Sequence, residues 1–509
     1  MSQEREPLVR TRMCIVVVLF TLSIFVLLTP GHFTTSMDFT AFRTALNLVE
    51  NRQWGFSERI THELAQGKDG KYYSYEGLII MLSPVPLVLI SKAMGMSTGV
   101  LALLTNGIIT AFVSLLLLLV AREMGYSMRT SLLLVFAYSL GTQALVHTKF
   151  LMPDPLASLV FLSIFLCFLK YEKNGDRKWL VFLGGLCGAA AHVRPDSFLF
   201  VIGILVGLFL IFKKEFAGKE RSVRKTVSDI TAFALPVFGF LVLFALYNSL
   251  RFGSILETGY TKVVEERGLA STKLLGDFQL KKLLLGLAGM WIIPNRSIFF
   301  LNPVLIFSLI SMKGFWRKFR RSAIIIGVAL VFYALLYANR GPYGFAGSAA
   351  WGQRYLLPMT AFMVLPMGLF IERVFSAGKR RLRILFIGVL VVSILIQIIG
   401  ASQNYQNFQA PMERQFGSEK ARIMLTMEPK FSLLLLNMRL LLRGHTDFMF
   451  YKNLRSGNLP LWMIGSLFVL VLMALISGYF LSEPILSDTK EPAPQEKHQR
   501  RRGKRSKRG

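Results

Sequence analysis

Long apolar stretches recur along almost the whole chain and alternate with short polar segments. Most are roughly 16 to 24 residues long, which is typical of a helix that crosses a membrane. The pattern predicts an all-α polytopic membrane protein with about 12 transmembrane helices. The predicted spans are 13–29, 98–121, 130–147, 155–170, 179–193, 197–212, 231–247, 296–311, 322–339, 355–371, 384–400 and 460–481.

The first span follows a basic N-terminus, as the apolar part of a signal peptide would, but no small-residue cleavage site comes after it. We therefore expect a retained signal anchor. A further apolar stretch, 78–95, carries Pro84 and Pro86 in its middle. Two interpretations are open, because a helix bent by prolines either crosses the membrane or returns as a re-entrant or interfacial helix.

The distribution of Lys and Arg distinguishes these two interpretations. Five short loops carry 22 Lys and Arg residues, whereas three alternating connections carry 4. Loops rich in Lys and Arg stay on the cytoplasmic side, so an even number of crossings joins a cytoplasmic N-terminus to the basic C-terminus. This predicts that 78–95 is re-entrant or interfacial. The basic loops are 122–129, 170–178, 213–225, 313–321 and 372–383, and the connections are 148–154, 192–196 and 339–354.

This topology gives a domain organisation and a location at the plasma membrane, with both termini cytoplasmic. The connections that carry Asp154, Arg194 and Arg354 fall on the same extracytoplasmic side as the long loops, which predicts one site at that surface. The expected parts are a cytoplasmic N-terminus (1–12), a transmembrane module (13–400) with outer loops 30–77 and 248–295, an extracytoplasmic loop (401–459), a last span (460–481) and a basic disordered cytoplasmic tail (482–509).

The composition is consistent with the predicted membrane topology. The chain is 53% hydrophobic and carries a net charge of +30, which in a soluble protein would indicate nucleic-acid binding. Most of the charge lies in the short loops and the tail, so no nucleic-acid partner is predicted. The three cysteines lie in apolar stretches without CxxC spacing, which indicates packed thiols.

Asp38 is the first candidate for chemistry. It lies in the segment TTSMDFTAF (34–42), directly after the first span, and the apolar residues that follow it predict an amphipathic helix at the membrane surface. Asp38 is suited to be the N-cap of this helix. It is also a candidate catalytic carboxylate, and the roles are compatible because a cap fixes a carboxylate's position. The repeating apolar residues are Phe39, Phe42, Leu46 and Val49.

The stretch GKDGKYYSYEG (67–77) combines a predicted turn at Asp69 with tyrosines and an acid. Tyr73 and Tyr75 are suited to stack on sugar rings, although an aromatic belt at the membrane interface is the commoner use. Glu76 lies beside the predicted re-entrant helix and is a second acidic candidate.

Two short turns carry further candidates. Asp154, in MPDPLASL, is either a helix cap or a catalytic carboxylate. Arg194, in HVRPDS, either binds a phosphate or pairs with Asp196 and extends its charged group to the interface. Arg251, in NSLRFGSILETGY, is a third basic candidate.

The densest polar cluster is 337–358, which contains Trp351 and Arg354. Arginine suits bidentate phosphate binding beside a membrane, while an aromatic and basic anchor is the alternative role. The chain contains no GxGxxG, Walker, HExxH or GxSxG motif, and its six histidines are scattered, so no zinc site is argued. No cofactor is predicted with certainty, and a divalent metal remains open.

The order of these motifs resembles the GT-C superfamily of polyprenyl-phosphate-sugar-dependent glycosyltransferases. The similarity is greatest to the protein O-mannosyltransferase and aminoarabinose-transferase families, and it covers roughly residues 13–400. The motifs are an early outer-loop Asp38, then an EN-R-W stretch (50–54), DGKYYSYEG, MPDPLASL, HVRPDS, NSLRFGSILETGY, NRSIFFLNPVLI and WGQRYLLP.

The resemblance implies an inverting transfer of a sugar from an isoprenoid-phosphate donor to an acceptor hydroxyl on the outer face. It implies that Asp38 is the general base, and that Asp154 or Glu76 supplies a second carboxylate, because Phe39 stands where the family often has another acid. Arg354, Arg194 and Arg251 would bind the donor phosphate. Tyr73, Tyr75 and Trp351 would contact sugar or acceptor. The expected partners are the lipid-linked donor, a glycan, lipid or protein acceptor, and membrane lipids.

A transporter or flippase without bond chemistry is the alternative function. It would be marked by charged residues inside the spans and by internal repeats. The predicted spans contain very few charges, and no clear repeat is visible.

Overall fold

The computed structural model describes residues 5–218, 222–266, 279–340, 350–376, 378–457 and 460–486. Most of the predicted tail, from residue 487 on, lies outside the described residues. Within the described ranges, eight helices are long and apolar enough to cross a membrane. The predicted all-α, multi-pass membrane architecture is confirmed, whereas the count of about 12 spans is not. The eight are Thr98–Glu123, Pro153–Asn174, Pro195–Ala217, Val223–Phe252, Arg320–Ala338, Arg354–Ser376, Arg380–Ala401 and Met463–Ile485.

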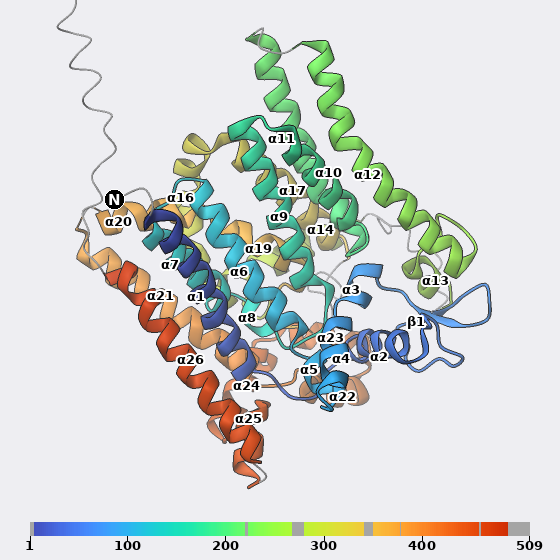
Figure 1. The fold of residues 1–509 in the computed structure, drawn as a ribbon. Helices are drawn as coiled ribbons and strands as arrows, with labels where there is room; N and C mark the ends of the chain where they lie inside the picture. The colour runs from blue at the N-terminus through green and yellow to red at the C-terminus, as the bar shows by residue number, and fades with distance from the viewer. Residues whose placement is uncertain are drawn as a thin grey trace, which may run out of the picture.

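The helices form a bundle in which successive members run up and down (Figure 1). The first helix, α1 (Arg5–Leu27), packs along the last, α26 (Leu461–Leu486), and the start of α1 lies at the same end of the bundle as the end of α26. The other long members are α6 (Thr105–Glu123), α7 (Met128–Ser139), α9 (Pro153–Asn174), α10 (Arg177–Ala190), α11 (Phe198–Ala217), α12 (Val223–Phe252), α14 (Leu280–Trp291), α16 (Ile306–Lys318), α17 (Arg320–Ala338), α20 (Met367–Ser376) and α21 (Arg380–Ala401).

Short helices connect these members. Two of them, η1 and η2, begin at a proline, which fits the first turn of a helix because its missing N–H has no partner there. They are α8 (Ala144–His147), η1 (Pro195–Ser197), α15 (Ile298–Leu301), η2 (Pro303–Leu305), η3 (Arg354–Leu356) and α19 (Leu357–Met363).

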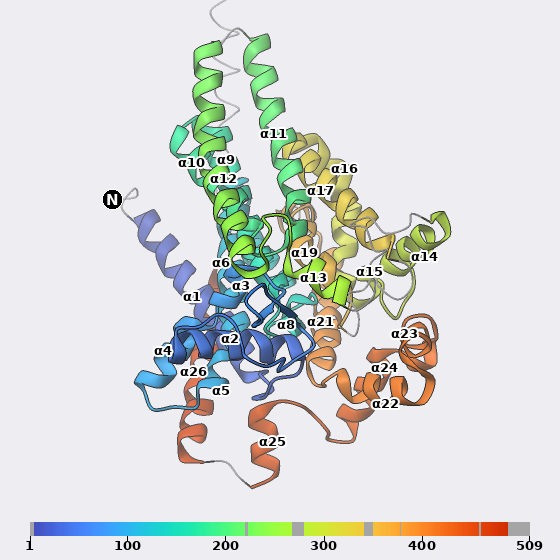
Figure 2. The ribbon, with the colours of Figure 1, turned by 90° about the vertical axis from the view of Figure 1, so that its right-hand side faces the viewer.

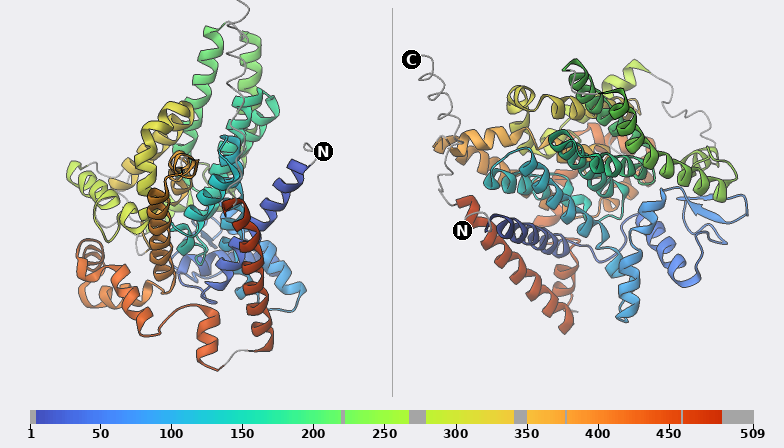
Figure 3. Two further views of the ribbon diagram at one scale, coloured as in Figure 1. Left: turned by 90° about the vertical axis from the view of Figure 1, so that its left-hand side faces the viewer. Right: turned by 45° about the horizontal axis from the view of Figure 1, so that its top comes forward.

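The two ends of the bundle differ. We call the end with the short loops rich in Lys and Arg, among them 170–178 and 313–321, the basic end. The opposite end, where α9 begins and α17 ends, is the site end. Figure 3 shows that α11 and α12 project beyond the other helices at the basic end.

The segments at the site end lie across the bundle (Figure 2). A two-stranded antiparallel hairpin follows α2 and pairs Leu64 with Ser74. Its turn is the predicted one, where Gly70 has φ 80° and Asp69 accepts a hydrogen bond from the Lys71 amide. The elements are α2 (Ser36–Asn51), β1 (Leu64–Gln66), β2 (Tyr72–Ser74), α3 (Leu78–Leu82), α4 (Val85–Ala93), α5 (Thr98–Ala102), α13 (Gly259–Glu266), α22 (Gln406–Phe416), α23 (Ser418–Met427), η4 (Pro429–Phe431), α24 (Leu433–Leu442) and α25 (Met449–Arg455).

The ambiguous stretch 78–95 is broken in two, as its prolines predicted. It consists of α3 and α4, of 5 and 9 residues, which meet at Ser83 and Pro84. A helix of nine residues is about 14 Å long, less than half of the roughly 30 Å of a membrane core. The break at the prolines is therefore present, and the re-entrant or interfacial placement of this stretch stays a prediction.

One predicted span is misplaced. The span expected over 296–311 is instead divided into α15, η2 and α16, and the long helix begins only at Ile306. The physical reason is Pro303, which cannot donate to the preceding turn and leaves Asn302 outside helical geometry (φ −131°, ψ 67°). The hydropathy pattern alone does not reveal this break.

Aromatic side chains fill the centre of the bundle. The Phe161 and Phe200 rings stack with centroids 4.5 Å apart, and the Phe165 ring meets the edge of Phe362 at 5.4 Å. These contacts join α9, α11 and α19. The packing fixes the position of the start of α9, where the first site residue lies.

Candidate active site

Asp154 is the centre of a buried ionic cluster at the site end. It is the second residue of α9 and is 0% exposed. Its Oδ2 accepts a hydrogen bond from Arg354 Nε at 2.8 Å, and its Oδ1 accepts one from Arg194 Nη1. The first turn of a helix favours a carboxylate because unpaired N–H groups give that end a positive potential. The prediction that these three residues lie together is confirmed.

Arg194 is fully engaged within this cluster. Its Nε and Nη2 donate to the two carboxylate oxygens of Asp196, each at 2.9 Å, and Nη2 also donates to the Tyr337 hydroxyl at 2.6 Å. The pairing with Asp196 is one of the two roles open at the sequence level. Because each of its three nitrogens already has a partner, Arg194 is better placed to hold Asp154 than to bind a ligand.

Arg354 has donors to spare. Only Nε donates to Asp154, and Nη2 has the weak contact with Met37 Sδ at 3.8 Å. No partner of Nη1 is found in the part of the chain that the structure describes. A guanidinium anchored through one nitrogen keeps its outer fork for a bidentate anion. Among the three predicted phosphate-binding arginines, Arg354 has the geometry that suits the role best.

Asp38 does not occupy the N-cap position that the sequence suggested. The N-cap of α2 is Thr35, and Asp38 is the third helical residue of a reciprocal capping box. Thr35 Oγ1 accepts from the Asp38 amide at 3.0 Å, and Asp38 Oδ2 accepts from the Thr35 amide at 3.0 Å. The prediction was wrong by three residues because a threonine before the acid takes the cap.

The two oxygens of Asp38 are used unequally. Oδ2 accepts from the Thr34 amide, the Thr34 hydroxyl and the Thr35 amide, whereas Oδ1 accepts only from the Leu151 amide at 2.9 Å. Asp38 is 0% exposed, and this burial raises its pKa above the ordinary value although the hydrogen bonds from Thr34 and Thr35 oppose the rise. Oδ1 therefore retains a lone pair for a further donor.

Glu76 is a second buried carboxylate beside the cluster. The Tyr260 hydroxyl donates to its Oε2 at 2.7 Å, and burial raises its pKa to about 7. Its position is set by Gly77, since a Cβ there would come within 2.0 Å of the His192 carbonyl oxygen. This close approach holds Glu76 near the turn that carries Arg194, whose charge acts on it.

Two of the predicted sugar or acceptor contacts, Trp351 and Tyr73, and one predicted phosphate ligand, Arg251, are built into the framework. Trp351 is 3% exposed, donates to Gln397 Oε1 at 3.0 Å and packs on Gly400, so its ring presents no free face to a sugar. The Tyr73 hydroxyl donates to Asp69 at the hairpin turn. Arg251 donates to the Ser74 carbonyl and stacks 3.6 Å from the Tyr247 ring centroid. Partners distant in sequence explain the outcomes for Trp351 and Arg251, and the local turn explains that for Tyr73.

Tyr75 differs from Tyr73, since it lies beside the acidic group. Its ring contacts that of Tyr260 at 4.7 Å, and the charges of Glu76 and Arg354 both act on its hydroxyl. Of the predicted aromatic contacts, Tyr75 is the one that the fold brings to the carboxylates.

Arg354 is positioned by an amide network that the motif analysis did not use. Gln143 Nε2 donates to the Gln353 carbonyl at 2.8 Å, and the Gln353 amide donates back to Gln143 Oε1 at 2.8 Å. The Gln143 amide in turn donates to Asn302 Oδ1 at 2.6 Å. The signal was present, because a glutamine inside a predicted span is expensive to bury without partners.

The carboxylates do not form a metal site in the described ranges. No group of three or more His, Cys, Asp or Glu side chains converges there. Asp154 is closed by two arginines, and Asp38 by amides and hydroxyls. The residues present do not fit a divalent ion, and we derive no step through one.

Comparison with known proteins gives one family and one fold. The model of the family described as dolichyl-phosphate-mannose-protein mannosyltransferase matches residues 91–251. No curated protein matches the chain. The oligosaccharyltransferase of Archaeoglobus fulgidus, in complex with Zn and sulfate, has a TM-score of 0.51 at 14% identity over 82% of this chain. This chain spans 57% of that protein.

Two further structures are similar at lower scores. The same archaeal enzyme with an inhibitory peptide and a dolichol-phosphate has a TM-score of 0.48 at 13% identity, over 85% of this chain and 61% of that chain. ArnT from Cupriavidus metallidurans bound to undecaprenyl phosphate has a TM-score of 0.45 at 12% identity, over 87% of this chain and 79% of that chain.

The predicted resemblance to the GT-C superfamily is confirmed by the family match and the shared fold. Together they support the predicted enzyme class, a glycosyltransferase. The matched residues 91–251 include Asp154 and Arg194 but neither Asp38 nor Arg354. The roles of individual residues therefore rest on the geometry described above.

Proposed function

We propose that this chain transfers a sugar from a polyprenyl-phosphate-linked donor to an acceptor hydroxyl on the extracytoplasmic face of the plasma membrane. One observation carries the proposal: Asp154, which is itself paired with Arg194, holds Arg354 by one nitrogen at the site end, so that the remaining donors of Arg354 are available to an anion. The match to a dolichyl-phosphate-mannose-dependent family supports a lipid phosphate as that anion. The excess of Lys and Arg in loops of the basic end supports the cytoplasmic placement of that end.

In the proposed reaction Asp38 is the base. Its Oδ1 takes the proton of the acceptor hydroxyl while the hydroxyl oxygen attacks the anomeric carbon. The bond from that carbon to the lipid-phosphate oxygen breaks on the opposite side, so the configuration inverts. Arg354 stabilises the charge that develops on the departing phosphate. A positioned base contributes about 10²–10⁴-fold to such a step.

The position of Asp38 supports this role. Met37, the residue before it, contacts Arg354 Nη2, so the capped start of α2 lies next to the proposed phosphate site. Four donors fix the carboxylate, and only one of them uses Oδ1. Glu76, whose pKa is raised by burial and on which the charges of Arg354 and Arg194 act, is proposed to position the acceptor together with Tyr75.

The test is transfer by the purified full chain in lipid nanodiscs, supplied with polyprenyl-phosphate-linked sugars and a mixture of hydroxyl acceptors. We expect release of polyprenyl phosphate and a glycosylated product. Asp38→Asn is expected to lower the rate by about 10²–10⁴-fold. Asp69→Asn, at an exposed turn of the same outer segment, is the matched control and should leave the rate unchanged.

Two results would overturn the proposal. Wild-type transfer by the folded Asp38→Asn variant would exclude Asp38 as the base. Movement of the intact donor across a vesicle membrane, without release of polyprenyl phosphate, would identify a transporter instead.

A further inference from the structure

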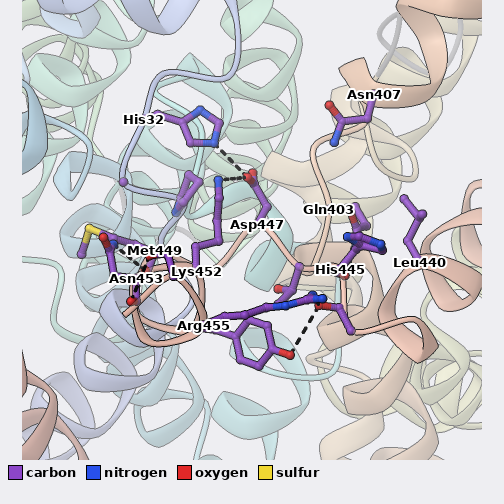
Figure 4. Close-up of a pocket in the computed structure, with 16 residues that line it drawn as sticks. His32, Gln403, Asn407, Leu440, His445, Asp447, Met449, Lys452, Asn453 and Arg455 are labelled. Atoms are coloured by element: carbon purple, nitrogen blue, oxygen red, sulfur yellow. Dashed lines mark hydrogen bonds and ion pairs between the residues drawn. The ribbon is translucent and has the colours of Figure 1, made fainter. Parts of the chain in front are cut away.

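A large cavity whose lining includes many polar side chains lies at the site end and plays no part in the chemistry described so far. It has a volume of about 910 Å³ and is formed between residues 30–32, at the end of α1, and the segment 403–456. Ligand sites in proteins typically measure about 300–1,000 Å³, so a ligand of several rings fits this space. Figure 4 shows its side chains converging from two walls.

The cavity is rich in groups that bind anions. His32, His445, Lys452 and Arg455 line it, against the single carboxylate of Asp447. Lys452 is 45% exposed and Arg455 is also exposed, so both retain donors that face the open space. Such side chains form charge-assisted hydrogen bonds with phosphate or carboxylate groups.

Asp447 provides a hydrogen-bond acceptor in the same cavity. Its Oδ1 accepts from His32 Nε2 at 2.8 Å and from Lys452 Nζ at 2.9 Å, as the dashed lines in Figure 4 show. Its Oδ2 is buried and has no hydrogen-bond partner in the described residues, and the whole side chain is only 9% exposed. A buried carboxylate oxygen without a donor is costly, and a ligand hydroxyl would satisfy it.

The cavity is linked to the proposed base through two short stretches of chain. Gln403, in its wall, accepts at its carbonyl from Lys149 Nζ at 2.6 Å, and Lys149 stands two residues before Leu151, whose amide donates to Asp38. On the other wall, His32 stands two residues before Thr34, which donates twice to Asp38. A ligand held in the cavity would therefore contact His32 and Gln403, which are linked in this way to the residues that hold Asp38.

From this combination we infer that the cavity between residues 30–32 and 403–456 binds the acceptor, and that the acceptor is an anionic glycan. Cations at the rim take its phosphate or carboxylate group, and Asp447 Oδ2 accepts from one of its hydroxyls. This inference rests on the proposed function, since it assigns the substrate that the transferred sugar reaches. The same chemistry is found in a free acidic oligosaccharide and in the headgroup of a membrane glycolipid.

Binding is tested without any donor, so that transfer is not required. Glucose 6-phosphate and glucose serve as the charged and neutral probes, and ligand-detected NMR measures their binding to the full chain in phosphatidylcholine nanodiscs. We expect glucose 6-phosphate to bind about tenfold more tightly than glucose, a difference of about 1.4 kcal/mol. Lys452→Ala with Arg455→Ala should abolish this preference. Asp447→Asn should weaken both probes.

Lys430→Ala is the matched control, because Lys430 is 71% exposed in the same segment and pairs only locally with Glu428. It should bind the probes as the wild type does. Nanodiscs that contain phosphatidylinositol, whose headgroup is a phosphorylated hydroxylated ring, separate the two sources. Displacement of glucose 6-phosphate by this lipid identifies a membrane-lipid headgroup as the ligand. Undiminished binding of glucose 6-phosphate in its presence identifies a soluble glycan.

Equal binding of the two probes, or an unchanged preference in the Lys452→Ala, Arg455→Ala variant, would overturn the inference. Binding of an acidic peptide in place of either phosphosugar form would overturn it as well and indicate a protein acceptor. Failure of the proposed function is distinguishable, because phosphosugar binding with no transfer from any donor leaves the cavity assignment in place. When transfer does occur, the same double variant should raise the KM for the acceptor and leave that for the donor unchanged.

Discussion

The two ends of α9 both carry a carboxylate paired with arginine, and the two pairings differ in burial. At the basic end Arg321 lies 2.5 Å from Glu172, with the side chains 27% and 25% exposed. At the site end Asp154 is 0% exposed between Arg194, at 5%, and Arg354, at 12%. The same residue types thus form a solvated pair at one end and a closed cluster at the other.

The difference separates charges that orient the chain from charges that serve a site. Partly exposed pairs contribute about 0–1 kcal/mol and follow from a loop rich in Lys and Arg. A buried cluster loses hydration that its internal attractions only partly replace, so apolar residues of similar volume would often be as stable. Burial of three charges at the site end is therefore better explained by function than by stability.

The largest effect is expected from removal of the central carboxylate. Asp154→Asn leaves two buried guanidiniums without their shared partner and should destabilise the fold by about 3–5 kcal/mol. Glu172→Gln, the corresponding change at the basic end, should cost no more than about 1 kcal/mol. Thermal unfolding of both purified variants in the same detergent measures the difference. Similar losses at both ends would contradict the comparison.

A smaller effect on stability, but a large one on rate, is expected from Arg354→Lys. Lysine keeps the charge beside Asp154 and loses the planar fork, so the chain should fold while transfer at saturating donor falls by about 10²-fold. Arg321→Lys should transfer sugar at the wild-type rate. If the two variants showed equal activity, Arg354 would not bind the leaving phosphate.

A moderate effect that depends on pH is expected at Glu76. Its pKa is raised by burial from 4.5 to about 7. Between these values the unfolded chain has lost the proton and the folded chain keeps it, so stability falls as pH rises from 4.5 through 7. Glu76→Gln removes this loss and keeps an acceptor for Tyr260. Its unfolding midpoint relative to the wild type should therefore be higher at pH 8 than at pH 4.5, and a constant difference would refute this assignment.

The smallest effect is expected from Lys173→Ala at the basic end. Lys173 Nζ lies 2.9 Å from Glu123 and its side chain is 66% exposed. Because water and salt screen the two charges, such a pair contributes at most about 0.2–1 kcal/mol to the free energy of unfolding. Unfolding at low and high salt should show a shift near the error of the measurement. A loss comparable with that of Asp154→Asn would remove the distinction between the two ends.

Charge distribution along the sequence predicted the grouping of Asp154, Arg194 and Arg354. The excess of Lys and Arg in alternate loops assigned their three turns to one side, and the fold brings them into contact. The prolines at 84 and 86 likewise predicted a break in 78–95. Both inferences use properties that act locally and repeat along the chain, which is why sequence alone carries them.

Contacts between distant segments were beyond the reach of the sequence. From the sequence, Trp351 resembles an exposed aromatic anchor, but in the fold it is enclosed by Gln397 and Gly400. From the sequence, Arg251 resembles a phosphate ligand, but in the fold it donates a hydrogen bond to the Ser74 carbonyl of the hairpin. In each case the partner is more than forty residues away, and no local pattern encodes the match.

The order in which the chain is synthesised adds a constraint on the buried cluster. Asp154 and Arg194 are 40 residues apart, whereas Asp154 and Arg354 are 200 apart. At about 5–20 residues per second, a ribosome needs roughly 10–40 s to add those 200 residues. Once Arg194 has been added, 40 residues into that interval, it is the one arginine of the cluster available to neutralise Asp154 until Arg354 follows. The nascent membrane protein thus depends first on Arg194 for insertion, and only the completed helix at Arg354 closes the site.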